Sequence, residues 1–388
     1  MKIIIYEMRK SWLKISAVIL LIILSILDMI CLSDMCKRNN DRVYGELGQS
    51  YYRAYNKFCG EITEEKISLL KKESDELAAE VADGLYSTEY DPNRYTGYIF
   101  GDNVLLNNEI KPKMSYCILY PNTSNKIALT AYENIDFYKS LGCDFEARKN
   151  EKIAEMYKDR YIPEYRTTVW TDTFFNYDFS SLLCIIMLIF GLSASISTEH
   201  ETAMIQLIIS AGKGRKTTVS KIISAAIYCA ILSLYFVVID IMGINAFLGI
   251  DGMNMPIYSA QIFEKTPYNF SFITAIILYA GLRFLSLFLV SLIIMLFSQI
   301  FKNSILSISF SFASVIALIV LSTMDRSIFN PVNLFISRTY LEKFEVLNFF
   351  NYPVLSLTAA SLMIFIMSIL SIVMIIFVGR IRGEYFHD

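Results

Sequence analysis

A short polar stretch between two apolar blocks carries residues of the kind that hold phosphate groups. The stretch LIISAGKGRKTT, residues 207–218, contains two glycines, three cationic side chains and two threonines. A loop of the G-x-x-x-x-G-K-[ST] type wraps phosphates with backbone N–H groups and directs its hydroxyl to magnesium. In that register Leu207 stands at the first glycine position and Gly214 at the hydroxyl position. The sequence therefore predicts that this chain does not bind ATP itself.

Histidine and cysteine, the usual zinc ligands, are sparse or scattered. The chain has two histidines, His200 and His387, and none of its seven cysteines forms a C-x-x-C pair. A structural zinc site needs such pairs or a His/Cys cluster. We therefore expect no catalytic residue, no cofactor site and no metal site in this chain. A disulfide between two of Cys59, Cys117 and Cys143 is left open.

Three charged side chains lie within long apolar blocks. Arg283 lies inside the fourth block, whereas Asp28 and Asp240 lie nearer the outer ends of the first and third. A charge at that depth costs at least about 2.5–3.5 kcal/mol on insertion scales, so Arg283 should face protein or a water-filled cavity. Two interpretations stay open. The three residues line a translocation path, or they form a buried structural ion pair or hydrated helix ends.

The elements that must carry these residues are six apolar blocks. The chain of 388 residues is 54% hydrophobic, above the level of about 45–50% in soluble proteins, and the excess is concentrated in the blocks. Each block is long enough to cross about 30 Å of hydrocarbon as a helix. We predict an α-helical polytopic membrane protein with six transmembrane helices, at residues 15–32, 179–197, 219–242, 270–300, 305–323 and 354–378.

The distribution of basic residues predicts the orientation of these spans. Cytoplasmic loops carry an excess of lysine and arginine, and no A-x-A cleavage site follows the first block, which we read as a retained span. The chain is thus expected to be a multi-pass protein of the cell membrane, with both termini cytoplasmic and residues 34–178 extracellular. The basic residues on the cytoplasmic side are Lys2, Arg9, Lys10, Lys14, Lys213, Arg215, Lys216, Lys221, Lys302, Arg380 and Arg382. No basic tract predicts a nucleic-acid partner.

The polar region between the first two spans is predicted to be a mixed α/β extracellular domain. Amphipathic helices are expected at residues 43–58 and 62–84, and a third at 149–161 leads back to the membrane. Short strands are expected at residues 96–106 and 115–121, between turn residues. The chain then divides into an N-terminal interfacial segment with the first span (1–33), the extracellular domain (34–178) and the remaining five spans (179–388).

The loop between the second and third spans is predicted to contain a short amphipathic helix. Ala203, Met204, Leu207 and Ile208 make an apolar face, and the glycines near residue 214 end the helix. The motif around it resembles that of the ABC-2 type transporter permease family. The residues that carry the resemblance are Glu199, Glu201, Leu207, Ile208, Ile209, Ser210, Arg215 and Lys221, and the chain departs from the family in having Thr202-Ala203 where Gly-Thr is usual. Six spans and an N-terminal segment of residues 1–12 also match.

The resemblance implies the membrane subunit of an ABC exporter. Residues 199–214 would then be a coupling helix that docks on a separate cytoplasmic ABC ATPase subunit, which binds the ATP and magnesium. Glu199, Glu201 and Arg215 would make charged contacts, with Ser210 in the same motif, and Leu207 and Ile208 would pack. The working unit would contain a second permease chain, as a homo- or heterodimer among membrane lipids, and would export a peptide, lipid-like or drug-like substrate. Residues 324–353 would form short re-entrant helices that close an outer gate.

Other interpretations of the same residues remain. The loop helix could lie on the membrane surface with its basic residues reaching lipid headgroups, and residues 324–353 could be a plain surface loop. The whole chain could instead be a membrane sensor whose extracellular domain binds a ligand and signals through a cytoplasmic partner. An intramembrane enzyme ranks last, because the spans contain no histidine and no acidic pair at mid-depth.

Overall fold

The computed structural model describes residues 2–44, 48–84, 90–211, 213–324, 327–335 and 338–381, and these are mostly helical. Six helices in these ranges are long and apolar enough to cross a membrane, which confirms the six predicted spans and indicates a multi-pass membrane protein. They are Ile15–Asn40, Val169–Glu201, Gly214–Leu248, Phe272–Ile300, Ser304–Met324 and Ser356–Ile381.

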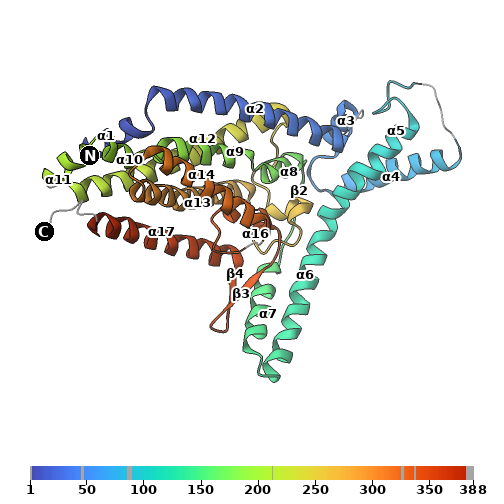
Figure 1. The fold of residues 1–388 in the computed structure, drawn as a ribbon. Coiled ribbons are helices and arrows are strands. Elements are labelled where there is room, and N and C mark those ends of the chain that lie inside the picture. The colour runs from blue at the N-terminus through green and yellow to red at the C-terminus, as the bar shows by residue number, and fades with distance from the viewer. Residues whose placement is uncertain are drawn as a thin grey trace.

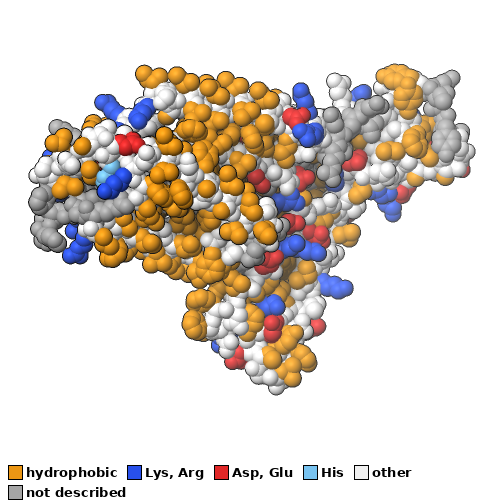
Figure 2. Space-filling model, viewed as in Figure 1, with side chains coloured by type: hydrophobic (Ala, Val, Ile, Leu, Met, Phe, Trp, Pro, Cys, Tyr) orange, Lys and Arg blue, Asp and Glu red, His pale blue; other side chains and the backbone are white. Residues whose placement is uncertain are grey.

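The spans form one bundle around a central helix. Helix α13 (Phe272–Ile300) packs against α9 (Phe179–Leu192), α12 (Gly214–Leu248), α14 (Ser304–Met324) and α17 (Ser356–Ile381). Helix α2 (Ile15–Tyr44) lies along α12 and α9 and runs past the predicted domain boundary at residue 33. Figure 1 shows these long helices side by side. Apolar side chains cover much of the face of the bundle that Figure 2 shows, as expected for a surface that faces lipid rather than water.

The two ends of the bundle differ, and we name them by what they carry. The loop end carries α1 (Lys2–Ser11), α10 (Ser197–Glu201) and α11 (Met204–Ser210), together with the last turn of α17 (Figure 1). The domain end carries the region between the first two spans. The predicted loop helix of residues 199–214 is thus divided between α10 and α11, and Gly212 lies outside the described residues.

The second span is interrupted rather than continuous. Helix α9 ends at Leu192 and α10 begins at Ser197, inside the predicted span of residues 179–197. The backbone groups freed by the break are paired with serines of neighbouring helices. Ser298 of α13 accepts hydrogen bonds from the backbone N–H groups of Ile196 and Ser197, both at 3.1 Å, and Ser307 of α14 donates to the Ser193 carbonyl at 2.5 Å. Such partners are what allow a helix to break at membrane depth.

The region at the domain end is helical, so the predicted strands at residues 96–106 and 115–121 are wrong. These residues belong to α5 (Ile99–Val104), the π-helix η2 (Leu105–Ile110) and α6 (Lys111–Ser140). The buried residues Leu106, Ile110, Met114 and Cys117 recur every three or four positions across the two segments, which is a helical period. Pro112 lies in the first turn of α6, where a helix tolerates proline.

The other predicted helices of this region are confirmed. They are α3 (Gly48–Phe58), α4 (Glu64–Ala82) and α7 (Asp144–Tyr157), although Leu47 and the side chain of Val43 lie outside the described residues. Helices α6 and α7 form a long hairpin that projects from the bundle (Figure 1). In the described part of this region, the strands are one two-residue antiparallel pair, β1 (Gly60–Glu61) with β2 (Glu164–Tyr165). The region is completed by α8 (Val169–Asn176), which leads into α9.

The segment after α14 turns back into the bundle. The backbone carbonyl of Pro331 accepts a 2.6 Å hydrogen bond from Ser286, in the middle of α13, and Asn330 donates to the Leu318 carbonyl at 2.8 Å. All four residues of α15 (Val332–Phe335) are buried there. The chain continues through α16 (Arg338–Glu342) and a hairpin of β3 (Val346–Phe349) and β4 (Tyr352–Leu355) into α17. Residues 325, 326, 336 and 337 of the predicted re-entrant segment lie outside the described ranges. Between α12 and α13 are two short 3₁₀ turns, η3 (Ile257–Ser259) and η4 (Gln261–Phe263).

Candidate functional site

The loop at the end of the second span presents an apolar ridge to the solvent. Ala203 joins α10 to α11 with a left-handed φ of 55°, which turns α11 across the end of the bundle. Ile205 and Ile208 of α11 face a small cavity beside α12 and are partly buried. Leu207 points the other way and is 70% exposed, with Met204 beside it one turn earlier. The predicted apolar face is thus divided, since Leu207 is free for a partner and Ile208 packs inward.

Glu199 does not lie on this surface. Its side chain is 2% exposed and forms ion pairs with Lys10 of α1 and Lys221 of α12. Lys221 also donates to the Ser195 carbonyl at 3.4 Å. In this arrangement Glu199 cannot make the outward contact that the sequence motif predicts, and it instead joins α1, α10 and α12.

Helix α1 is held on α12 by two further groups. The ring nitrogen of Trp12 donates to Ser224 Oγ at 3.2 Å, and the Trp12 ring stacks on Tyr228 with centroids 4.8 Å apart. Glu7 of α1 is buried close to Lys221. Burial raises the pKa of the Glu7 carboxyl above its ordinary value, against the opposing attraction of Lys221. The N-terminal segment was predicted to be interfacial and to mark a membrane side, and the structure adds this attachment to the loop.

The remaining motif residues lie at the loop surface. Glu201 is exposed and accepts hydrogen bonds from the backbone N–H and the hydroxyl of Ser304, at 2.7 and 2.8 Å, so it caps the start of α14. Ser210 is exposed and donates to the carbonyl of Leu207 at 3.1 Å. Arg215 is exposed in the first turn of α12, between the exposed Lys213 and Lys216. We call Met204, Leu207, Ser210, Lys213, Arg215 and Lys216 the loop surface.

A second candidate site is a polar cluster inside the bundle, nearer the domain end. Its charged members, Asp28 of α2, Asp240 of α12 and Arg283 of α13, are 0%, 2% and 0% exposed. Arg283 Nη1 lies 3.7 Å from Asp240 Oδ2, so these two side chains form an ion pair. Three helices distant in sequence thus meet at this cluster, as the distribution of charges suggested.

Uncharged groups complete the cluster, and sequence reasoning missed them. Arg283 donates to the hydroxyls of Ser180 (2.6 Å), Ser181 (2.8 Å) and Tyr279 (3.0 Å), and Ser180 donates to Asp240 Oδ2 at 2.7 Å. Tyr177 donates to Asp28 Oδ1 at 2.8 Å. The signals available were a serine pair at the start of an apolar block and a tyrosine four residues before the arginine. Both patterns are too common to identify a site alone.

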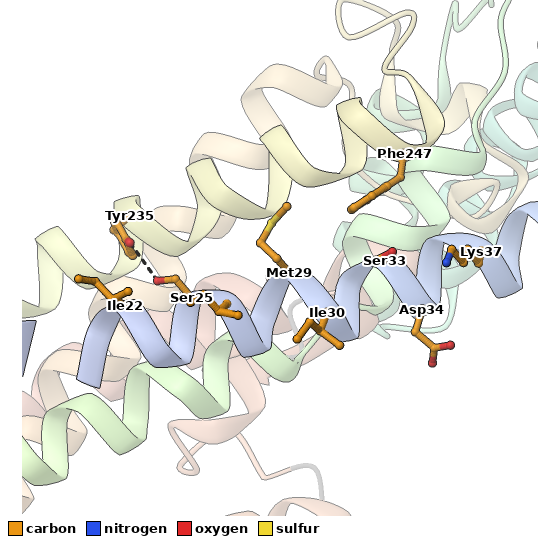
Figure 3. A pocket seen from close by; sticks show the side chains of 10 residues that line it. Ile22, Ser25, Met29, Ile30, Ser33, Asp34, Lys37, Tyr235 and Phe247 are labelled. Carbon is orange, nitrogen blue, oxygen red and sulfur yellow. Dashed lines mark hydrogen bonds between the residues drawn. The ribbon is translucent and has the colours of Figure 1, made fainter. Parts of the chain in front are cut away.

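A groove runs along the seam between α2 and α12 beside this cluster (Figure 3). Its volume is about 700 Å³, and the hydroxyls of Ser25 and Tyr235 lie 2.9 Å apart in it. Its wall is otherwise mostly apolar and becomes polar towards the domain end. The lining residues are Ile22, Ser25, Ile26, Met29, Ile30, Ser33, Asp34, Lys37, Tyr235 and Phe247.

The described ranges contain neither a metal-ligand cluster nor a disulfide. No group of three or more His, Cys, Asp or Glu side chains there could hold a metal ion. All seven cysteines are free thiols, so the disulfide left open among Cys59, Cys117 and Cys143 is not formed in this structure.

Comparison with protein-family models, with curated proteins and with solved structures finds no match to this chain. The arrangement of the loop surface and of the polar cluster therefore carries the functional argument.

Proposed function

We propose that this chain is the transmembrane permease subunit of an ABC exporter, and that a separate ATPase subunit docks on the loop surface. The observation that carries the proposal is Leu207, a large apolar side chain that is 70% exposed on a short helix leading into α12. An exposed apolar residue rimmed by polar ones is typical of a protein contact site. The ABC-2 motif of residues 199–221 supports the same assignment.

The contacts around the loop surface could transfer a movement of α11 to the helices behind it. Arg215, Lys213 and Lys216 offer cations to an acidic groove on the ATPase, and Leu207 fills its apolar part. Behind this surface, Glu199 ties the loop to α1 and α12, and Glu201 ties it to α14. A displacement of α11 is thus passed to three helices. In this proposal Glu199 and Glu201 are positioning residues.

The wider arrangement follows from the same proposal. The loop end, with its lysines and arginines, is cytoplasmic, and the domain end is extracellular. A second permease chain, identical or different, completes a path for a peptide, lipid-like or drug-like substrate among the membrane lipids. The segment that packs α15 against α13 is the outer gate.

The test is co-purification of the full chain with an ABC ATPase subunit from its native cells. We expect Leu207→Asp and Arg215→Glu each to reduce ATPase binding and ATP-dependent transport at least about tenfold, which is a loss of about 1.4 kcal/mol. Lys302→Glu, in the loop between α13 and α14 at the same end, is the matched charge control and should bind normally. If Leu207→Asp and Arg215→Glu leave both binding and transport intact, the docking assignment is wrong.

One observation favours a second function, a ligand-binding sensor. The projecting hairpin holds a pocket of about 690 Å³ between α6 and α7. Its largely apolar wall includes Leu129, Tyr132 and Ile135 from α6 and Ala154 from α7, and such walls are typical of small-molecule sites. A sensor would bind a kinase rather than an ATPase at the loop end, so the same co-purification separates the two functions.

A further inference from the structure

The polar cluster inside the bundle has an unbalanced charge. Two carboxyl groups, Asp28 and Asp240, face one guanidinium, that of Arg283. Asp28 and Asp240 lie on two helices, α2 and α12, that pack closely together beside them. If both were ionised, two like charges would lie near each other in a site that is closed to water, which is strongly unfavourable.

The hydrogen bonds of the two carboxyl groups leave one oxygen on each without a donor. Tyr177 donates to Asp28 Oδ1 and Ser180 donates to Asp240 Oδ2. Within the described part of the chain, no donor reaches the buried oxygens Asp28 Oδ2 and Asp240 Oδ1. An ionised carboxylate can only accept, whereas a protonated one carries an O–H donor. A single proton between the two groups would supply the missing donor and would restore charge balance with Arg283.

The other titratable groups near the pair do not supply that balance. Cys31 lies on α2, Tyr177 and Asp178 precede α9, Cys184 lies on α9 and Tyr279 lies on α13. None of these groups carries a positive charge in any protonation state. Among the described residues that face the pair, Arg283 is the one cation, and its hydrogen bonds go to hydroxyl groups.

We propose that Asp28 and Asp240 share one bound proton and form a proton-binding site that joins α2 to α12 inside the membrane. The proton is held as an O–H bond on one carboxyl and a hydrogen bond to the other, and it leaves to water when the site opens. Loss of the proton leaves two carboxylates in contact and drives α2 away from α12. The seam that would open is the one beside the groove in Figure 3.

Helices α2 and α12 pack tightly beside Asp28 and Asp240, so their separation would break this packing. Gly243 lies one turn after Asp240, and a Cβ built there would come within 2.6 Å of Leu32 Cδ2 and 3.2 Å of Met29 Sδ on α2. The two helices are therefore in close contact next to the pair. A small outward shift of α2 would break both the packing and the carboxyl contact.

Infrared spectroscopy of the purified full-length protein tests the proposal, because a protonated carboxyl has its own carbonyl stretching band. We expect this band at neutral pH in the unmodified protein and its loss in Asp28→Asn, where Asp240 stays ionised against Arg283. Asp34→Asn, an exposed acid on the same helix, should keep the band. Absence of the band in the unmodified protein, its persistence in Asp28→Asn, or its loss in Asp178→Asn would each overturn the assignment.

Thermal unfolding in detergent gives an independent readout. The amide of Asp28→Asn is neutral and can donate to Asp240 Oδ1, so this variant should fold and unfold at nearly the temperature of the unmodified protein. The unmodified protein should lose stability as the pH rises above neutral, whereas Asp28→Asn should not. If Asp28→Asn is strongly destabilised at neutral pH, the carboxyl group is needed in its charged form and the shared proton is excluded.

Discussion

The buried carboxyl group of Glu7, at the loop end, makes the stability of the protein depend on pH. Burial holds the pKa of Glu7 above its ordinary value of 4.5. Well below pH 4.5 the carboxyl is protonated in the folded and unfolded chain alike, so its burial carries no charge penalty. As the pH rises through the raised pKa, the buried carboxyl ionises and this contribution to stability is lost.

We therefore expect Glu7→Gln to stabilise the protein at neutral pH and to have no effect well below pH 4.5. Thermal unfolding of both proteins across this pH range, followed by tryptophan fluorescence, is the measurement. Glu65→Gln, an exposed acid at the start of α4, serves as the control. An equal difference between Glu7→Gln and the unmodified protein at every pH would contradict the explanation.

The charged members of the polar cluster could be predicted from sequence, but the hydroxyl groups that hydrogen-bond to them could not. A charge inside an apolar block is rare and costly, so Arg283 is visible at once. Ser180 and Tyr177 are ordinary residues whose role depends on which helices meet. Similarly, two acids spaced as Glu199 and Glu201 point to different sides of a helix, and the sequence does not tell which of them faces inward.

The break between α9 and α10 is supported by serines of neighbouring helices, and Ser298 satisfies two of its backbone groups. Ser298 Oγ accepts two backbone N–H groups of the break, from Ile196 and Ser197, and it is fully buried. Its replacement leaves buried donors without a partner, which costs about 1–3 kcal/mol. We expect Ser298→Ala to destabilise the protein by that amount in unfolding experiments.

Ser368→Ala is the matched control for this experiment. Ser368 is also buried in a span, but its hydroxyl only donates to the Ile364 carbonyl of its own helix. Its replacement frees no backbone N–H group and should cost less. Equal effects of the two replacements would mean that Ser298 does not support the break.

The same break explains why the second span was predicted as continuous. Residues 193–196 are Ser-Ala-Ser-Ile, small or apolar residues that a continuous span also accepts, so they do not reveal the break. The signal lies in Ser298 and Ser307, more than a hundred positions away along the chain. The strands wrongly predicted at 96–106 and 115–121 are a different case. There the helical period was present, but short windows between turn residues concealed it.

For the whole molecule, the number and approximate positions of the spans could be predicted because apolar length is a strong signal. Their ends could not, since several helices continue into polar sequence. The predicted membrane orientation can be tested by labelling Cys143. This thiol is exposed at the turn of the α6–α7 hairpin. We expect a membrane-impermeant maleimide to label it on intact cells, and Cys143→Ala to lose that label.

The opposite end needs an introduced thiol. Leu207→Cys in the Cys143→Ala background should be labelled only after the membrane is made permeable, since the loop end is expected to be cytoplasmic. Labelling of Leu207→Cys on intact cells, together with protection of Cys143, would reverse the orientation. The arrangement of helices would be unaffected by that outcome.

Helix α12 gives the molecule a mechanical property. Its 35 residues run without a proline from Gly214, beside the loop surface, to Leu248, so it is about 50 Å long. Just past its far end, the Asp251 carbonyl accepts a 2.7 Å hydrogen bond from Trp170. A tilt of one degree about the near end moves the far end by about 0.9 Å over that length. If α12 moved as a rigid lever, a small tilt at the loop would be felt at the Trp170 contact at the opposite end.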